Sequence, residues 1–325
     1  MREVPDQPLQ PWQPPDYTVD ADGRVEGASA GTPNTWGRWG HTDQKGTANL
    51  LTAERVAAAA GLIRTGRRFS LGLPIGGPAT PGYRAAPLHL FDATTGDRVL
   101  GEPGLQWSDD FLVLNTQAST QVDALSHFGT AGLLYNGYWA GVVTARSGAR
   151  RLGVHHLADG LVGRAVLLDV ARHLGVERVE VAEPVGPDLL QAVVDAQRVE
   201  VGEGDILLIR TGATGWWMAQ AQPPPAGSEP GLSPRCIPWL AERDVAMVAT
   251  DTLAVEVMPP EEGVRPLALH VGALRDLGLL LGELFDLDEL AADCAGDGVY
   301  ESFFVAAPLP IVNGVGSPIN PIAIK

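Results

Sequence analysis

Three apolar runs in the middle of the chain predict buried parallel strands. Residues 161–170, 206–211 and 245–251 are almost continuous in Val, Ile, Leu, Ala and Met. Such runs are typical of strands covered on both faces, because a half-exposed strand alternates apolar and polar positions. Helical patterns separate the strands: Pro187 and Asp188 begin a helix that runs to Gln197, and residues 237–242 predict another. Strands alternating with helices favour an α/β fold.

Shorter elements are predicted on either side of these runs. Thr52 is a suitable N-cap for a helix through the alanines to Ile63, which Gly66 then ends. Residues 270–280 predict a helix or helical turn. Further strands are predicted at 68–75, 279–284 and 303–310. Residues 76–110 and 220–234 are dense in Gly, Pro and Asp and predict loops, the first with short strand candidates.

The N-terminal residues differ from the remainder of the chain. Residues 1–35 are rich in Pro, Asp and Gly with little apolar periodicity, so we expect an extended N-terminal arm that wraps a neighbouring subunit. Residues 36–325 show no internal repeat and no linker-like segment. They therefore predict a single domain.

Composition excludes several classes of function. The net charge of −16 repels phosphate backbones, so we expect no nucleic-acid partner. No apolar run approaches the roughly 18 residues that span a bilayer, and the N-terminus has no signal-peptide core. The two cysteines, Cys236 and Cys294, lack metal-type spacing and form no disulfide framework. A cytoplasmic protein without a membrane partner is the expectation.

The most informative segment is 115–128. Gln117, Gln121, Asp123 and His127 interrupt a stretch of small and apolar residues. Polar groups are costly to bury unless each has a partner, so this cluster favours a lined pocket over a packed core.

This segment resembles the signature of the cyclase/kynurenine formamidase-like family of metal-dependent hydrolases, His-x-Gly-Thr-His-x-Asp-x-Pro-x-His. Its defined positions fall on Gln117, Ser119, Thr120, Gln121, Asp123, Leu125 and His127. The spacing is kept, but both metal-binding histidines of the signature are glutamines here. Further similar blocks are 36–40, 43–52, 134–137, 163–169, 204–212 and 283–290. The likeness thus covers most of the chain from Trp36 onward.

The resemblance implies a fold and a set of residue roles. The fold is a swivelling β/β/α type, with a mixed sheet and flanking helices, usually assembled as a homodimer or homotetramer. Asp123, His270 and Glu283 stand at ligand positions for a divalent ion, and His127 stands at the position of the general acid/base. From the sequence alone, His270 follows an apolar stretch and is expected to be a structural core residue, and Glu283 is expected to form a surface salt bridge. Asp123 has the alternative role of capping a turn.

The glutamines leave the metal content open between three readings. In the first, Asp123, His270 and Glu283 hold one ion, and the glutamines contact substrate or the ligands. In the second, Gln117 and Gln121 are themselves weak ligands, which suits Mn²⁺ or Mg²⁺ better than Zn²⁺ because an amide offers oxygen. In the third, no metal is bound, and His127, Asp123 and Glu283 perform acid–base chemistry.

The expected function is hydrolysis of a C–N amide, or a related cyclic amide or lactone, in a small aromatic or alicyclic substrate. An ion with an open position polarises a carbonyl, and an imidazole such as that of His127 transfers protons near neutral pH. Trp36, Trp39 and His41 are expected to line the substrate pocket, although the tryptophans can equally anchor the N-terminal arm. The alternatives are a non-hydrolytic cyclase, dehydratase or isomerase, and a binding protein that has lost turnover.

Overall fold

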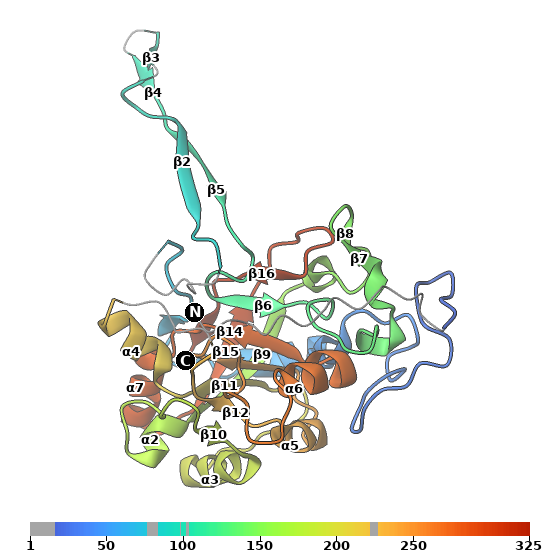
Figure 1. The fold of residues 1–325 in the computed structure, drawn as a ribbon. Helices are drawn as coiled ribbons and strands as arrows, with labels where there is room; N and C mark the ends of the chain where they lie inside the picture. Colours follow the sequence, from blue (N-terminus) through green and yellow to red (C-terminus); the bar gives the residue numbers. More distant parts are fainter. Residues whose placement is uncertain (1–16, 77–83, 98, 102–103, 222–226) are drawn as a thin grey trace.

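A computed structural model describes residues 17–325 except 77–83, 98, 102–103 and 222–226. At its centre lies one curled mixed sheet (Figure 1). Its nine strands are, in spatial order, β1 (Arg68–Ser70), β17 (Ile322–Ile324), β15 (Glu301–Ala306), β9 (Leu161–Asp169), β11 (Ile206–Arg210), β13 (Met247–Thr250), β14 (Leu280–Glu283), β6 (Gln121–Asp123) and β16 (Gly316–Pro318). This sheet and its helices confirm the predicted single α/β domain.

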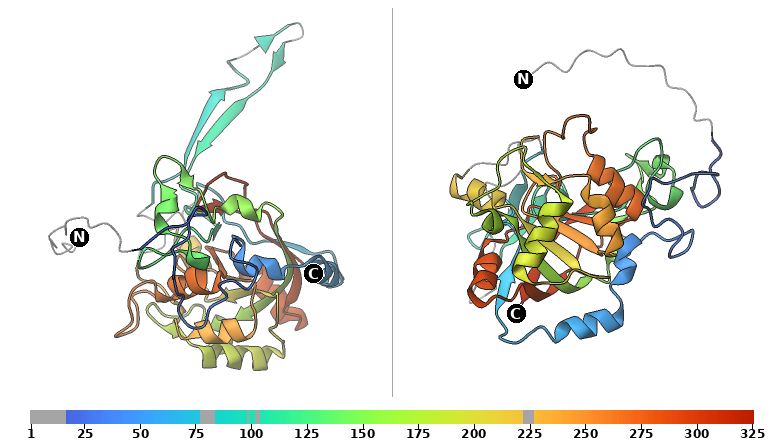
Figure 2. Two further views of the ribbon diagram at one scale, coloured as in Figure 1. Left: turned by 90° about the vertical axis from the view of Figure 1, so that its right-hand side faces the viewer. Right: turned by 90° about the horizontal axis from the view of Figure 1, so that it is seen from below.

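Helices flank the sheet (Figure 2). The α-helices of the described residues are α1 (Ala53–Ala60), α2 (Val170–Leu174), α3 (Pro187–Gln197), α4 (Ala213–Ala219), α5 (Cys236–Glu242), α6 (Ala268–His270) and α7 (Asp288–Asp297). Helix α6 continues into a π-helical segment, Val271–Leu277, and short 3₁₀ turns occur at 46–50, 135–137, 140–142 and 154–157. No helix among the described residues is both long and apolar enough to cross a membrane.

The predicted central strands are confirmed. Strands β9, β11, β13 and β14 run parallel to one another, and their residues are almost all buried, as the continuous apolar runs require. Helix α1 begins where the sequence indicates, with the Thr52 hydroxyl accepting a hydrogen bond from the Arg55 backbone N–H. Helices α3 and α5 match their predicted positions closely.

Several boundaries were wrong, for identifiable reasons. The strand predicted at 68–75 ends at Ser70, because β1 pairs only with the three residues of β17. The strand predicted at 303–310 ends at Ala306, shortly before Pro308, which has no N–H to donate. Helices α2, α4 and α7 were not predicted, since each is short or lacks a clear apolar period.

The predicted loop at 76–110 is largely a hairpin. Strand β2 (Leu88–Ala93) pairs antiparallel with β5 (Asp109–Val113), and β3 (Val99–Leu100) pairs with β4 (Leu105–Gln106) beyond them. This hairpin projects well away from the body (Figures 1 and 2). Two further short pairs lie elsewhere, β7 (Val143–Thr144) with β8 (Gly148–Ala149) and β10 (Pro184–Val185) with β12 (Gly231–Leu232).

The described part of the predicted N-terminal arm contacts its own chain. The Gly31 N–H donates to Asp276 at 3.0 Å, and the Thr35 hydroxyl donates to the Leu277 carbonyl at 2.7 Å. Residues 1–16 lie outside the described residues. A boundary at residue 35 and contact of the arm with a neighbouring subunit stay predictions.

Candidate active site and metal centre

Strand pairing brings three polar side chains to one face of the sheet. Gln121 of β6 lies directly opposite Glu283 of β14, and Asp123 lies two residues further along β6. Directly opposed residues of an antiparallel pair point to the same face, and so do residues two apart on one strand. Gln121, Asp123 and Glu283 therefore share a face. No signal in the sequence predicted this pairing.

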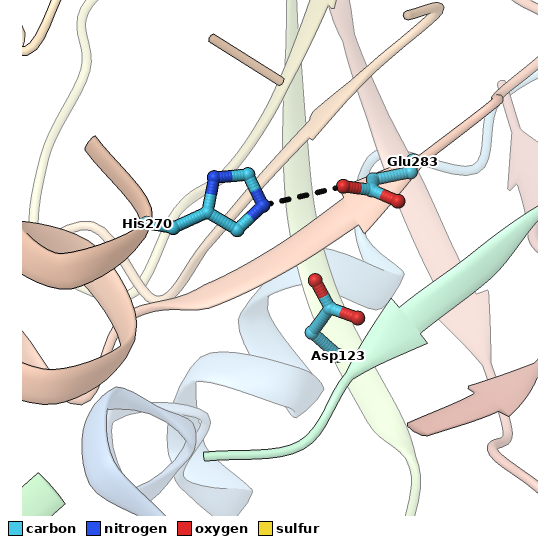
Figure 3. A group of neighbouring side chains, drawn as sticks. All are labelled: Asp123, His270 and Glu283. Carbon is cyan, nitrogen blue, oxygen red and sulfur yellow. Dashed lines mark ion pairs between the residues drawn. The ribbon is translucent and has the colours of Figure 1, made fainter. Parts of the chain in front are cut away.

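His270 completes the group from the end of α6. Its Nε2 lies 3.4 Å from Glu283 Oε1, and the three side chains of Asp123, His270 and Glu283 converge on a common space (Figure 3). One ligand atom from each lies within 4.8 Å of the others. All three residues are buried, with Asp123 fully inaccessible to solvent. The spacing suits one divalent ion.

The Asp123 carboxylate shows that the group fits a cation. Both of its oxygens are buried without a hydrogen-bond partner. Burial raises the pKa of Asp123 to about 6, the charge of His127 opposes this, and the charge of Glu283 adds to it. An unpartnered buried carboxylate is unfavourable, and a bound cation relieves it. The donor set of two carboxylates and one imidazole is one that Zn²⁺, Mn²⁺ and related ions accept.

Glu256 orients His270, and sequence reasoning missed it. Its Oε1 accepts hydrogen bonds from His270 Nδ1 at 2.6 Å and from the His270 backbone N–H at 3.0 Å. A carboxylate can only accept here, so Nδ1 carries the hydrogen and Nε2 faces Glu283. Burial acts to lower the pKa of His270, but its bonds to Glu256 and Glu283 outweigh burial and raise the pKa to about 10. A carboxylate behind a ligating histidine is a recurrent feature of metal sites.

A fourth buried carboxylate, Glu229, was also missed. Its Oε2 accepts a hydrogen bond from the Leu253 N–H at 2.6 Å, and its Oε1 is buried without a partner. Burial raises the pKa of Glu229 well above its ordinary value, and the charge of Glu283 adds to the effect. Glu229 precedes the Gly231–Leu232 strand in a segment that we had predicted to be loop, and nothing in the local sequence marks it.

The two glutamines occupy different places around the group. Gln121 Nε2 donates to Glu283 Oε2, and its Oε1 is buried without a partner. Gln117 Oε1 accepts from the Thr116 hydroxyl at 2.8 Å, and its Nε2 is buried without a partner. A Cβ atom at Gly316, which pairs with Asp123, would lie 2.5 Å from Gln117 Nε2, so a larger residue here would require this amide to move.

His127 lies where the buried group meets solvent. Its Nε2 is 3.7 Å from Asp123 Oδ1, within ion-pair range but too long for a hydrogen bond, and its side chain is 24% exposed. The ring of the adjacent Phe128 packs against His270, with ring centroids 5.5 Å apart. His127 is therefore placed to exchange a proton with solvent beside the Asp123 carboxylate.

The predicted aromatic lining lies in the N-terminal block. Trp36 Nε1 donates to the Arg275 carbonyl at 2.6 Å, in the π-helical segment that follows His270. Trp39 stacks under the Arg38 guanidinium at 4.9 Å. His41 is exposed, and its carbonyl accepts from Asn136 at 3.1 Å. These contacts resemble anchoring of the N-terminal residues, and a role in substrate binding stays a prediction.

The comparisons with known proteins identify the family. The profile of the family described as "Putative cyclase" matches residues 41–257, more than half of the chain, so the chain belongs to that family. A crystal structure of a novel cyclase is 37% identical, covers 90% of this chain and 99% of its own, and superposes with a TM-score of 0.82. Among curated proteins, none matches the chain significantly.

More distant solved structures share the fold. Isatin hydrolase A from Labrenzia aggregata, bound to benzyl benzoate, is 20% identical, with 82% of this chain and 94% of that chain covered and a TM-score of 0.59. An isatin hydrolase bound to the product analogue thioisatinate is 16% identical, with 84% and 98% covered and a TM-score of 0.57. At these identities the likeness shows the fold alone.

Removing the charge of Glu256 is expected to weaken ion binding. Glu256→Gln keeps an acceptor for His270 Nδ1 but loses the negative charge that makes the imidazole a stronger ligand, so we expect the dissociation constant for Mn²⁺ to rise about 10–100-fold. Titration calorimetry of the metal-free protein measures this constant. Glu242→Gln, on an exposed surface position, is the matched control and leaves it unchanged. Unaltered affinity in Glu256→Gln would show that Glu256 has only a packing role.

Proposed function

We propose that the protein is a hydrolase that opens the amide C–N bond of a small aromatic or alicyclic substrate, including a cyclic amide or lactone. The observation that carries the proposal is the buried group of Asp123, His270 and Glu283, in which both Asp123 oxygens lack a partner. These three residues hold the divalent ion. When bound, the ion supplies a polarised carbonyl and a more acidic water.

The unpartnered atoms of the two glutamine side chains favour an amide substrate over an ester substrate. Gln117 presents a free donor, Nε2, and Gln121 presents a free acceptor, Oε1. An amide carries one acceptor, its C=O, and one donor, its N–H, and so matches both. A lactone has no N–H and leaves Gln121 Oε1 unpartnered, at a cost of about 1–3 kcal/mol. We therefore rank amides above lactones as substrates.

The chain's own residues then perform three tasks. Asp123, His270 and Glu283 hold the cation, and Glu256 keeps His270 Nε2 directed toward it. The glutamines orient the substrate amide. His127 takes a proton from the attacking water and gives one to the leaving nitrogen, since it lies beside Asp123 and reaches solvent. Hydrolysis is also the reaction named for the isatin hydrolases that share this fold, which supports the proposal by analogy.

Ion content and chelation test the proposal. We expect about one Mn²⁺, Zn²⁺ or Mg²⁺ per chain by elemental analysis, and hydrolysis of at least one member of a panel of N-formyl aromatic amines, isatin and lactones. Activity is lost on removal of the ion and returns when it is restored. A metal-free preparation that retains full activity would contradict the proposal that hydrolysis depends on a metal ion.

A metal-free or metal-poor acid–base reaction without hydrolysis is the second candidate. The observation in its favour is His270, which lies between Glu256 and Glu283 and stays protonated at neutral pH because its pKa is raised to about 10. The positive charge of protonated His270 balances the negative charges of the Glu256 and Glu283 carboxylates without a metal. Product mass separates the candidates, because a cyclisation or isomerisation adds no water to the substrate, a dehydration removes one, and hydrolysis adds one.

A further inference from the structure

Arg84 reaches the buried group from outside the signature segment. Its Nη1 donates a hydrogen bond to the backbone carbonyl of Gln117, a residue that is only 6% exposed, and the Arg84 side chain is itself partly buried. Earlier in the chain, the Leu73 N–H donates to the Thr120 hydroxyl at 2.8 Å. Residues 73 and 84 therefore both contact the segment that carries Gln117. No motif in the sequence marks Arg84.

The positive charge of Arg84 acts on the Asp123 carboxylate. Burial raises the pKa of Asp123 to about 6. The charges of His127, His270 and Arg84 act against this rise, so each of the three lies near the carboxylate. Of these three cations only Arg84 keeps its charge throughout the working pH range, because a guanidinium does not lose its proton in proteins. Arg84 thus brings a permanent positive charge to the group.

The proposed hydrolysis creates a new negative charge in this site. The carboxylates of Asp123, Glu256 and Glu283 already lie around His270. When water adds to the amide carbon, its proton passes to His127 and the electron pair of the C=O bond passes to the oxygen, which becomes an oxyanion. The oxyanion returns the pair as the C–N bond breaks and the nitrogen takes the proton. A positively charged donor at this oxygen stabilises the transition state more than the substrate.

We propose that Arg84 is a catalytic residue whose guanidinium, together with Gln117 Nε2, binds the oxyanion that forms on the substrate carbonyl. This inference rests on the proposed amide hydrolysis. Gln117 Nε2 is buried without a partner and is the donor that matches the substrate carbonyl. Arg84 is bonded to the backbone of the same residue, so the two donors share one anchor. A guanidinium carries its N–H groups in a rigid planar fork, which allows it to bind a backbone carbonyl and a ligand oxygen at once.

Binding of two small aromatic probes tests the proposal without turnover. Phenylphosphonate carries tetrahedral anionic oxygens beside its ring, as the oxyanion intermediate does, whereas benzamide is neutral and planar at its carbonyl. Arg84→Met keeps an unbranched side chain but removes the charge and the donors. We expect it to raise the dissociation constant for phenylphosphonate about 100-fold and that for benzamide less than about 3-fold, by calorimetry with Mn²⁺ supplied. Arg84→Lys should lie between, and Arg146→Met, at an exposed position, is the matched control and changes neither constant.

Steady-state kinetics and chemical rescue provide the second test. On the panel amide that the parent hydrolyses fastest, Arg84→Met should lower kcat about 100-fold with little change in KM, because the oxyanion forms only after the substrate is bound. In Arg84→Ala, millimolar guanidinium ion should restore part of the lost phenylphosphonate affinity and part of kcat. The affinity for Mn²⁺ should stay within about 3-fold of the parent in each Arg84 variant, since Arg84 is not a ligand.

A parent that does not bind phenylphosphonate overturns the oxyanion role, and so does an Arg84→Met variant that binds it as the parent does. Equal losses of phenylphosphonate and benzamide binding, with a lowered melting temperature and no rescue by guanidinium, would show that Arg84 only anchors the chain to Gln117. The proposed function fails separately. Hydrolysis at the parent rate in Arg84→Met would contradict the role of Arg84 alone, whereas a parent that binds phenylphosphonate through Arg84 and hydrolyses no panel member would contradict amide hydrolysis itself.

Discussion

Asp123→Asn is expected to remove both ion binding and hydrolysis while leaving the chain folded. The substitution keeps the shape of the side chain but removes the negative charge and one acceptor oxygen from the buried group. We expect no measurable Mn²⁺ binding by calorimetry and a fall in kcat/KM of roughly 10³-fold or more, which corresponds to about 4 kcal/mol of lost transition-state stabilisation.

The same substitution, Asp123→Asn, should make the metal-free protein more stable although it removes activity. Both Asp123 oxygens are buried without partners, and burial raises the pKa of this carboxyl to about 6. The carboxylate is still mostly ionised at pH 7, but its charged form is less stable in the folded chain than in the unfolded chain. Neutralising it should raise the free energy of unfolding by about 1–3 kcal/mol. Functional sites often keep such unfavourable groups. Denaturant unfolding of the metal-free proteins at neutral pH measures the difference.

Asp251 provides the matched contrast, because burial raises its pKa to about 6 as well, but both of its oxygens have hydrogen-bond partners. It accepts hydrogen bonds from the Thr211 N–H at 2.8 Å and from the Gly212 N–H at 2.7 Å. Asp251→Asn should therefore destabilise the fold rather than stabilise it. If Asp123→Asn instead lost stability to the same extent and kept its activity, Asp123 would be a structural residue and the proposed centre would be wrong.

The sequence predicted the parallel strands well because their apolar runs are local and unambiguous. Residues 206–210 and 247–250 cannot be half-exposed strands, so their place in the middle of the sheet follows. The hairpin could not be predicted in the same way. Its strands carry apolar residues without a core to bury them, and the surrounding Gly, Pro and Asp residues indicate a loop.

The candidate site was only partly predictable. Asp123, His270 and Glu283 were selected from the resemblance to the cyclase family, and the structure brings these three together. Glu256 and Glu229 were missed because each reaches the site through long-range packing, with no spacing in the sequence that links it to His270 or Glu283. The roles of Trp36, Trp39 and His41 depend on where substrate lies, which neither local sequence nor the contacts of these residues determine.

Gln117→His combined with Gln121→His is expected to tighten metal binding and to impair hydrolysis. Imidazole binds Zn²⁺ better than an amide oxygen does, so restoring the two histidines of the family signature should lower the Zn²⁺ dissociation constant at least about 10-fold. The same change removes the free donor of Gln117 and the free acceptor of Gln121, and it breaks the bond from Gln121 Nε2 to Glu283. Each lost bond to substrate should raise the barrier by about 1–3 kcal/mol.

Calorimetry and steady-state kinetics on the two single variants and the double variant separate these effects. Gln220→His, at an exposed position, is the control for adding a histidine and should change neither quantity. If the glutamines orient the substrate, kcat/KM falls in both single variants, while Zn²⁺ affinity rises chiefly in Gln121→His, since Gln121 contacts the ligand Glu283. A double variant that binds Zn²⁺ no better than the parent and works equally well would show that neither glutamine has either role, because an imidazole cannot reproduce the donor and acceptor geometry of an amide.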